Sequence, residues 1–222
     1  MPPKFARGNS VQVFKDVKLL TYRGICVYGI AGLDPARRLA ILTIAARITF
    51  FATPLGLCGV AWTGRGIAGL QLPESTATAT RRRLRMRFSD ATVSETPPAI
   101  QDVVDTIIAL LEGRRADLSG VALDMDGIAE FDRRVYDVTR AIPCGTTLSY
   151  GAVAARLGDP GASRAVGQAL GRNPFPLIVP CHRVLSADGS LGGFSAAGGA
   201  TTKRRILAIE GAEAARQRGL FD

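Results

Sequence analysis

Short apolar runs separated by turn residues dominate the chain from about residue 46 onward. Residues 48–51, 57–62 and 66–70 are rich in strand-forming residues, and turns containing proline and glycine lie between them at 54–56 and 63–66. This pattern predicts a β-meander or hairpin. The most apolar region, 39–62, is interrupted by a charge, a proline and glycines. It therefore predicts core strands, because a membrane helix needs about 20 predominantly apolar residues.

Two further segments complete this first part of the chain. Residues 81–88 carry arginines at alternate positions, and we interpret them as an edge strand whose arginines form a solvated face rather than a DNA contact. Helical spacing follows between the prolines at 97–98 and Gly113, with apolar positions at Val103, Val104, Ile107, Leu110 and Leu111.

The second part of the chain has the spacing of several helices. Phe131, Val135, Val138 and Ile142 predict one helix, which the Pro-Cys-Gly sequence at 143–145 ends. Ser149 is a suitable N-cap for a helix over 150–157, and a second short helix over 162–170 follows a turn at 159–161. Two short helices joined by a tight turn form a helix-turn-helix, which binds DNA in some proteins and is a plain packing unit in others.

These elements predict an α+β fold. A small N-terminal domain with a β-meander and a helix, at 46–122, precedes a mainly helical C-terminal domain at 123–222 that contains the helix-turn-helix. Residues 1–45 show no repeat or capping pattern, and they are treated as an N-terminal extension with no assigned role.

The charge balance suggests a partner. The net charge is +9 at pH 7, the sequence pI is about 10.0, and arginine carries most of the positive charge. This balance suits a polyanion, with nucleic acid as the first candidate. A GC-rich genome also favours arginine codons, so the charge supports a nucleic-acid partner without establishing one.

The cysteines indicate a reducing compartment. Cys26, Cys58, Cys144 and Cys181 lie far apart, and His182 is the only histidine, which is unlike a zinc site or a disulfide framework. We therefore expect no metal site, and we expect the protein to be cytoplasmic. No charged start followed by an apolar core and a cleavage site opens the chain, so we expect no secretory signal.

The candidate chemistry lies at 177–184. An apolar run that we interpret as strand-like ends at Pro180, and Cys181 and His182 follow at once. A cysteine is nucleophilic as the thiolate, which a cationic or hydrogen-bonding neighbour favours. A lone histidine and a buried cysteine are more often structural, so the pair gains its weight from the helix that precedes it.

The predicted helix over 162–170 has an unusual surface. Only Arg164 projects far near its start, and the other positions named for this surface are small: Ala162, Ser163, Ala165, Gly167 and Ala169. Small residues around one long cation suit close approach to a groove of duplex DNA, with the arginine entering the duplex. They also suit tight packing against another helix.

Four motifs together resemble the O6-alkylguanine-DNA alkyltransferase family, also called methylated-DNA–protein-cysteine methyltransferases. They are Ser149-Tyr150, Arg164-Ala165-Val166-Gly167, Gly171-Arg172-Asn173-Pro174 and Pro180-Cys181-His182-Arg183-Val184, and the resemblance covers about residues 131–211. It implies DNA repair by direct damage reversal. One alkyl group, such as methyl, passes irreversibly from O6-alkylguanine in DNA to Cys181, and O4-alkylthymine is a further candidate substrate.

The resemblance also implies a role for each matching residue. Cys181 is the nucleophile and methyl acceptor, His182 is the base acting through a water molecule, and Glu210 orients His182. Tyr150 is the proton donor, and Asn173 braces the segment that carries the cysteine. No cofactor and no metal are implied, because the acceptor is the protein itself.

The implied partner is double-stranded DNA, bound by a monomer through the minor groove with the damaged base flipped out. The implied DNA contacts are Arg164, inserted into the duplex, and Tyr150, Ala162, Ser163, Ala165 and Gly167. The implied base pocket contains Val184, Phe194 and Ser195. The Ser195 amide donates to the O6 oxygen, and the carbonyls of Cys181 and Val184 accept from the exocyclic amine.

The chain departs from the family in two places. The loop 196–202 is slightly longer, which affects the register of Glu210, and Phe194 stands where some relatives have tyrosine. Three rival functions fit less well. A non-catalytic lesion binder lacks the cysteine, a transcriptional regulator needs side chains that reach base edges, and the histidine of a cysteine hydrolase is normally remote from the cysteine in sequence.

Overall fold

The described residues of the first unit of the chain form three short strands in the computed structural model. The structure describes residues 11–14, 17–22, 25–28 and 45–215, and residues 1–44 separate from residues 45–222 as a unit of their own. Strands β1 (Val11–Phe14), β2 (Val17–Tyr22) and β3 (Ile25–Tyr28) pair antiparallel in that order. The start of the apolar region 39–62, up to residue 44, lies outside the described residues.

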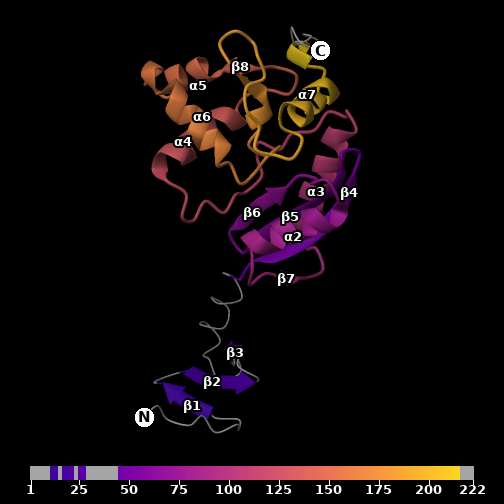
Figure 1. Ribbon diagram of the computed structural model, residues 1–222, viewed down its shortest axis with the longest axis vertical. Coiled ribbons are helices and arrows are strands. Elements are labelled where there is room, and N and C mark those ends of the chain that lie inside the picture. Colours follow the sequence, from indigo (N-terminus) through magenta and orange to yellow (C-terminus); the bar gives the residue numbers. More distant parts are fainter. Residues whose placement is uncertain (1–10, 15–16, 23–24, 29–44, 216–222) are drawn as a thin grey trace. The chain divides into compact units, whose positions relative to one another are not determined.

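The predicted β-meander is confirmed in the second unit. Strands β4 (Arg47–Thr53), β5 (Gly56–Thr63) and β6 (Gly66–Gln71) pair antiparallel in succession, and the short β7 (Thr92–Val93) joins β4 in parallel (Figure 1). Gly56 and Gly66 take φ values of 125° and 136°, which glycine adopts at no steric cost. The two turns therefore need glycine there.

The predicted edge strand at 81–88 is wrong, because these residues belong to helix α2 (Ala77–Arg87). The Thr76 side chain caps this helix by accepting a hydrogen bond from the Ala79 amide. In a strand, Leu84 and Met86 would lie on the same face, whereas Leu84 is 0% exposed and Met86 is 62% exposed. The helical turn separates them, so the alternating arginines were a misleading signal.

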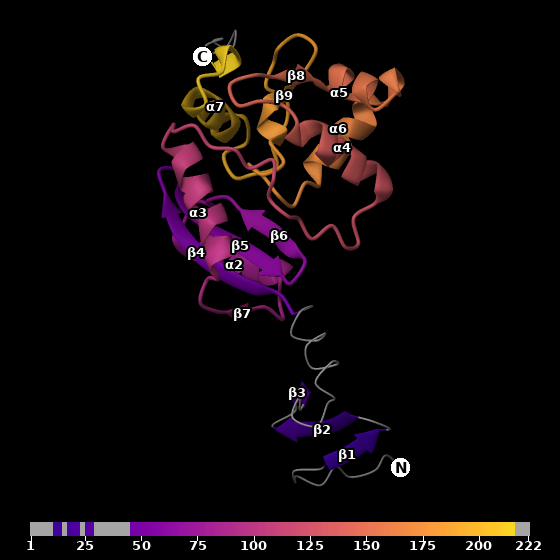
Figure 2. The ribbon, with the colours of Figure 1, turned by 180° about the vertical axis from the view of Figure 1, so that it is seen from behind.

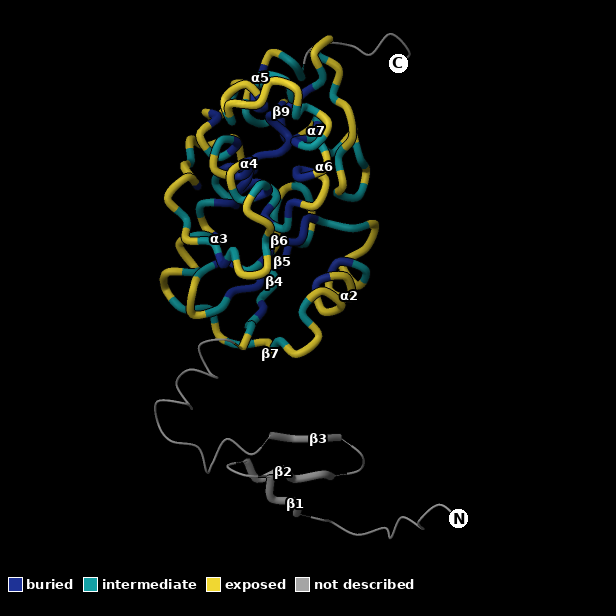
Figure 3. The backbone as a smooth tube through the Cα atoms, turned by 90° about the vertical axis from the view of Figure 1, so that its left-hand side faces the viewer, coloured by how far each residue is buried: buried dark blue, intermediate teal, exposed yellow. Residues whose placement is uncertain are grey.

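Two helices cover opposite faces of the sheet. Helix α2 packs Leu84 against Ile48 and Ala61, and α3 (Pro98–Leu111) belongs to the main core on the other face, where Val60 lies. Figure 3 shows the sheet between them, and α3 is the nearer helix when the molecule is seen from behind in Figure 2. The predicted helix before Gly113 is confirmed, with Pro98 at its first turn.

The helix-turn-helix is also confirmed. Helix α4 (Glu130–Arg140) precedes it, Ser149 caps α5 (Tyr150–Arg156) through the Ala152 amide, and α6 (Ser163–Gly171) follows the single turn η2 (Pro160–Ala162). The remaining elements are β8 (Leu148–Ser149), η3 (Cys181–Arg183), β9 (Val184–Leu185), α7 (Gly199–Ile209) and η4 (Glu213–Ala215). Strands β8 and β9 pair in parallel.

Residues 45–222 form one compact unit with a continuous core that includes side chains from the sheet, α3, α4 and α6. The Leu70 amide donates to the Pro174 carbonyl at 2.9 Å, which joins β6 to the segment after α6. The boundary at 122/123 stays a prediction. Among the described residues, no helix is long and apolar enough to cross a membrane.

Candidate active site

The segment before Cys181 is a tight buried turn, so the strand-like interpretation of 177–179 is wrong. Leu177 has a φ of 72°, and the Val179 amide donates back to the Phe175 carbonyl at 2.7 Å. The Asn173 side chain holds both ends, because its Oδ1 accepts from the Phe175 amide and its Nδ2 donates to the Val179 carbonyl, each at 2.9 Å. An apolar run buried on all sides has no periodicity that distinguishes a strand from such a turn.

Cys181 is held in a nearly closed environment at the start of η3. Cys181 is 7% exposed, and its backbone amide donates to the Val179 carbonyl. Burial raises the pKa of the Cys181 thiol, while a hydrogen bond from Asn173 and the charge of Lys203 oppose that rise. The thiol is therefore protonated at rest near neutral pH, and forming the thiolate requires a base.

His182 lies in a buried network with Glu210. The His182 Nε2 is 2.9 Å from the Glu210 carboxylate, and both side chains are 0% exposed. Burial lowers the pKa of His182, so the ring is neutral at pH 7. Because the carboxylate can only accept, Nε2 carries the proton and Nδ1 keeps a free lone pair. Among the described residues, no partner reaches that buried Nδ1.

Arg183 completes this network on its other side. Its guanidinium donates to both carboxylate oxygens of Glu210, at 2.9 and 2.7 Å, and to the Ile142 carbonyl at 2.6 Å. Burial favours the neutral acid, but the hydrogen bonds from His182 and Arg183 outweigh it and lower the pKa of Glu210 to about 2. The structure thus brings Glu210 to His182 across 28 positions in the sequence, despite the longer loop before α7.

Lys203 is a functional candidate that the sequence analysis missed. Lys203 is 0% exposed, and its ammonium donates to the carbonyls of Val184 and Leu191, both at 2.6 Å. Burial lowers the pKa of Lys203 to about 8, and its charge favours the Cys181 thiolate. The sequence did contain a signal of its burial, because Lys203 lies three and four residues before the buried Ile206 and Leu207 and so shares their face of α7.

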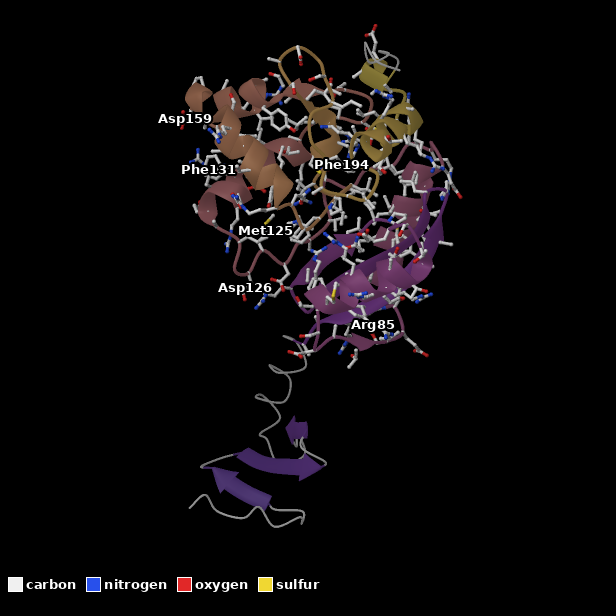
Figure 4. The ribbon with its side chains drawn as sticks, viewed as in Figure 1. Arg85, Met125, Asp126, Phe131, Asp159 and Phe194 are labelled. Atoms are coloured by element: carbon white, nitrogen blue, oxygen red, sulfur yellow. The ribbon has the colours of Figure 1, made fainter. Side chains whose placement is uncertain are left out.

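A cavity of about 520 Å³ opens beside Cys181. Of the predicted residues, Tyr150, Gly167, Phe194 and Ser195 line it together with Cys181. Its other lining residues are Leu170, Gly171, Ser186, Gly192 and Gly193. Phe194 lies between α6 and α7 in Figure 4. Val184 is fully buried and does not line the cavity, and its carbonyl already accepts from Lys203.

Tyr150 lies where this cavity meets a more open groove along α6. The groove is lined by Tyr150, Gly151, Ser163, Arg164, Gly167, Gln168, Ser186 and Ala187. Arg164 is exposed, whereas Ala162 and Ala165 are half-buried and do not line the groove. Burial and the nearby Cys181 both raise the pKa of Tyr150, so its hydroxyl stays protonated.

No group of three or more His, Cys, Asp or Glu side chains suited to a metal ion occurs among the residues that the structure describes. The cysteines whose side chains the structure describes are free thiols: Cys58, Cys144 and Cys181.

Comparisons with known proteins place these residues within a family match. The family described as 6-O-methylguanine DNA methyltransferase, DNA binding domain, matches residues 130–212. A methylated-DNA–protein-cysteine methyltransferase of Methanothermobacter thermautotrophicus is 40% identical over 158 residues, which are 71% of this chain and 81% of that protein. A protein of the same name from Mycobacterium bovis is 36% identical over 77% of this chain and 95% of its own length.

A solved structure agrees as well. The crystal structure of Mycobacterium tuberculosis OGT in complex with DNA is similar with a TM-score of 0.61 and 34% sequence identity. The similarity covers 77% of this chain and 97% of that one.

Proposed function

Because the chain belongs to the methylated-DNA–protein-cysteine methyltransferase family, we propose that it repairs DNA by moving the alkyl group of O6-alkylguanine onto its own Cys181. The observation that carries this proposal is the buried Cys181 beside both a cavity and a neutral histidine whose Nδ1 is free to accept a proton. A structural cysteine needs neither feature.

The proposed reaction is a displacement at the alkyl carbon. The Cys181 thiol passes its proton through a water molecule to His182 Nδ1, and Glu210 holds the ring in the tautomer that can accept it. The sulfur bonds to the alkyl carbon while the bond from that carbon to guanine O6 breaks. Tyr150 supplies a proton to the departing guanine, so the thiol proton is in effect exchanged for the alkyl group.

The product explains why one molecule repairs one lesion. A thioether carries no good leaving group, so nothing in this site regenerates Cys181. The thiol is itself the acceptor, and no methyl-donor cofactor enters the reaction.

The cavity beside Cys181 is the proposed pocket for the flipped base. Phe194 and Tyr150 supply aromatic walls, and the Ser195 amide donates to O6. The Cys181 carbonyl is the proposed acceptor for the exocyclic amine. The predicted second acceptor, the Val184 carbonyl, belongs to a fully buried residue outside the cavity lining and already accepts from Lys203.

The proposed DNA contact is the groove along α6, laid against the minor groove of a duplex by a monomer acting in the cytoplasm. The small residues Ser163 and Gly167 let the backbone approach, and the exposed Arg164 enters the space that the flipped base leaves. The half-buried Ala162 and Ala165 have short side chains that do not project beyond Ser163 and Arg164 towards the DNA. O4-alkylthymine in the same pocket is a second candidate substrate.

The intact mass of the protein after incubation with O6-methylguanine duplex DNA tests this function. We expect one added methyl group per molecule, located on the Cys181 peptide, with a plateau at one turnover. Unchanged mass with tight binding to the lesion would instead identify a non-catalytic lesion binder. Unchanged mass with no preference for the lesion would reject repair altogether.

Arg164→Ala should slow transfer from duplex DNA about tenfold. Extruding a base costs a few kcal/mol, and loss of the inserted side chain removes part of the compensation, where about 1.4 kcal/mol corresponds to tenfold. Single-turnover rates with duplex DNA and with the free base O6-methylguanine measure this effect. The free-base rate should not change. Arg115→Ala, at an exposed position after α3, is the control for lost charge.

Lys203→Met should raise the pKa of the Cys181 thiol and slow transfer about tenfold at pH 7. The ammonium is the nearby cation that favours the thiolate, so its removal makes the thiolate harder to form. The pH dependence of Cys181 alkylation by iodoacetamide measures the shift. Lys203→Arg keeps the charge and serves as the matched variant. An unchanged pH profile in Lys203→Met, with an unchanged melting temperature, would remove Lys203 from the mechanism.

A further inference from the structure

Helix α2 carries a concentration of positive charge that the proposed site does not use. Its second half, from position 81, contains five arginines at 81, 82, 83, 85 and 87, and the helix contains no acidic residue. All five arginines are exposed. Figure 3 draws α2 largely in the colour of exposed residues, with its buried side towards the sheet.

Two of these arginines have structural partners. Arg83 pairs with Glu74 at 3.2 Å. Arg87 donates to the carbonyls of Leu70 and Pro174, at 3.2 and 3.4 Å. These contacts tie α2 to the rest of the unit, so Arg83 and Arg87 are explained by the fold.

The other three arginines form what we call the arginine face: Arg81, Arg82 and Arg85. At 100° per residue they lie within about 100° of one another on the helix surface. Arg81 rests over the Phe50 ring at 4.6 Å, but Arg82 and Arg85 have no hydrogen-bond or ion-pair partner within the described part of the chain. Figure 4 labels Arg85 on this helix.

The fold does not require Arg82 or Arg85, whereas the contact of Arg81 with the Phe50 ring ties that arginine to β4. The Thr76 cap and the buried Thr80 and Leu84 hold α2 in place, and they do not involve the arginine face. Like charges three and four residues apart, such as Arg81 and Arg85, destabilise a helix by a few tenths of a kcal/mol. A set of unpaired like charges that costs stability is best explained by a partner of opposite charge.

We propose that the arginine face binds the phosphate backbone of duplex DNA outside the region covered by the helix-turn-helix. This inference rests on the proposed function, which makes duplex DNA the partner of the chain. The phosphate backbone is the recurrent ligand of unpaired arginines in DNA-binding proteins, and such contacts give affinity without reading sequence. A repair protein that meets lesions in any sequence needs that kind of contact.

The position of α2 within the unit makes this contact reachable. Arg87 contacts the Pro174 carbonyl, which places the last turn of α2 beside the segment that leaves α6. Arg85 and Arg82 lie two and five residues earlier, about 3 and 8 Å back along the helix axis. One turn of DNA is about 34 Å long, so the arginine face lies less than one turn of duplex from the end of α6.

The test compares two double variants on two duplex lengths. Arg82→Glu/Arg85→Glu reverses the face, and Arg114→Glu/Arg115→Glu makes the same change of net charge at exposed positions after α3. Glutamate is a good helix former and pairs with Arg81 at this spacing, so α2 should stay folded. Binding is measured against salt on lesion-bearing duplexes of about 10 and 30 base pairs, one and three helical turns.

On the long duplex, the α2 variant should bind about tenfold more weakly. The slope of log K against log salt concentration should become shallower by about 2, since each of the two lost phosphate contacts contributes about 0.9. On the short duplex, which extends only about half a turn on each side of a central lesion, the α2 variant should lose less affinity than on the long duplex. Equal behaviour of the two double variants on the long duplex would overturn the proposal. Methyl uptake by the wild type on the short duplex is scored separately, so failure of the arginine face and failure of the repair function give different results.

Discussion

Cys181→Ser should take up no methyl group from O6-methylguanine DNA. A serine hydroxyl fills nearly the same buried space but does not form the anion at neutral pH, whereas a thiol with His182 beside it does. The mass of the protein after incubation with the lesion-bearing duplex should stay unchanged. Binding to that duplex should persist, because the groove along α6 is untouched and the base pocket changes by one atom, oxygen for sulfur.

The two other cysteines whose side chains the structure describes provide the control for this result. Cys58 is fully buried, and burial raises the pKa of its thiol to about 11, so it is a poor acceptor. Cys144 is exposed and lies outside the base pocket. Cys144→Ser should therefore be methylated like the wild type. Methyl uptake by Cys181→Ser, mapped to either of these thiols, would assign the acceptor role elsewhere and reject Cys181.

Glu210→Gln should lower the free energy of unfolding by about 3 kcal/mol and slow alkyl transfer. Arg183 is 10% exposed and loses the carboxylate that binds its guanidinium on two sides, which leaves a buried charge without its counter-ion. The glutamine amide can donate as well as accept a hydrogen bond, so it no longer fixes the His182 proton on Nε2. Urea unfolding measures the first effect, and the single-turnover rate at pH 7 measures the second.

The acid limb of the stability curve separates this network from a general loss of packing. The pKa of Glu210 is lowered to about 2 from its ordinary value of 4.5, so its stabilisation is full above about pH 4.5 and disappears as the pH falls through about 2. A shift of that size corresponds to about 3 kcal/mol at neutral pH. Glu210→Gln should lose this pH dependence. An acid limb identical to that of the wild type would show that Glu210 is not the coupled group.

Local features of the sequence were sufficient for most elements of the second unit. The cap at Ser149, the proline in the first turn of α3, the helical spacing before Pro143 and the turns at Gly56 and Gly66 each act within a few residues, so periodicity and turn chemistry reveal them. The short motifs around Arg164, Asn173 and Cys181 carried the family resemblance for the same reason. Each motif is contiguous, and its residues can be identified without knowing what they contact.

Contacts between distant segments were decided only by the tertiary structure. Residues 81–88 alternate like a strand, but the packing of Leu84 on Ile48 and Ala61 selects a helix, and no local pattern contains that partner. The turn at Leu177 is set by Asn173 and by burial on every side.

The catalytic electrostatics have the same origin. Glu210 has its low pKa because Arg183 and His182 meet it across 27 and 28 positions, and Lys203 reaches the Val184 carbonyl across 19. Burial and charge depend on what folding places around a side chain, whereas helices and turns depend mainly on neighbours in the sequence. The sequence by itself therefore indicated the motifs around Cys181 but not Lys203, and the tertiary structure decided the protonation of these residues, their partners and the course of the chain between them.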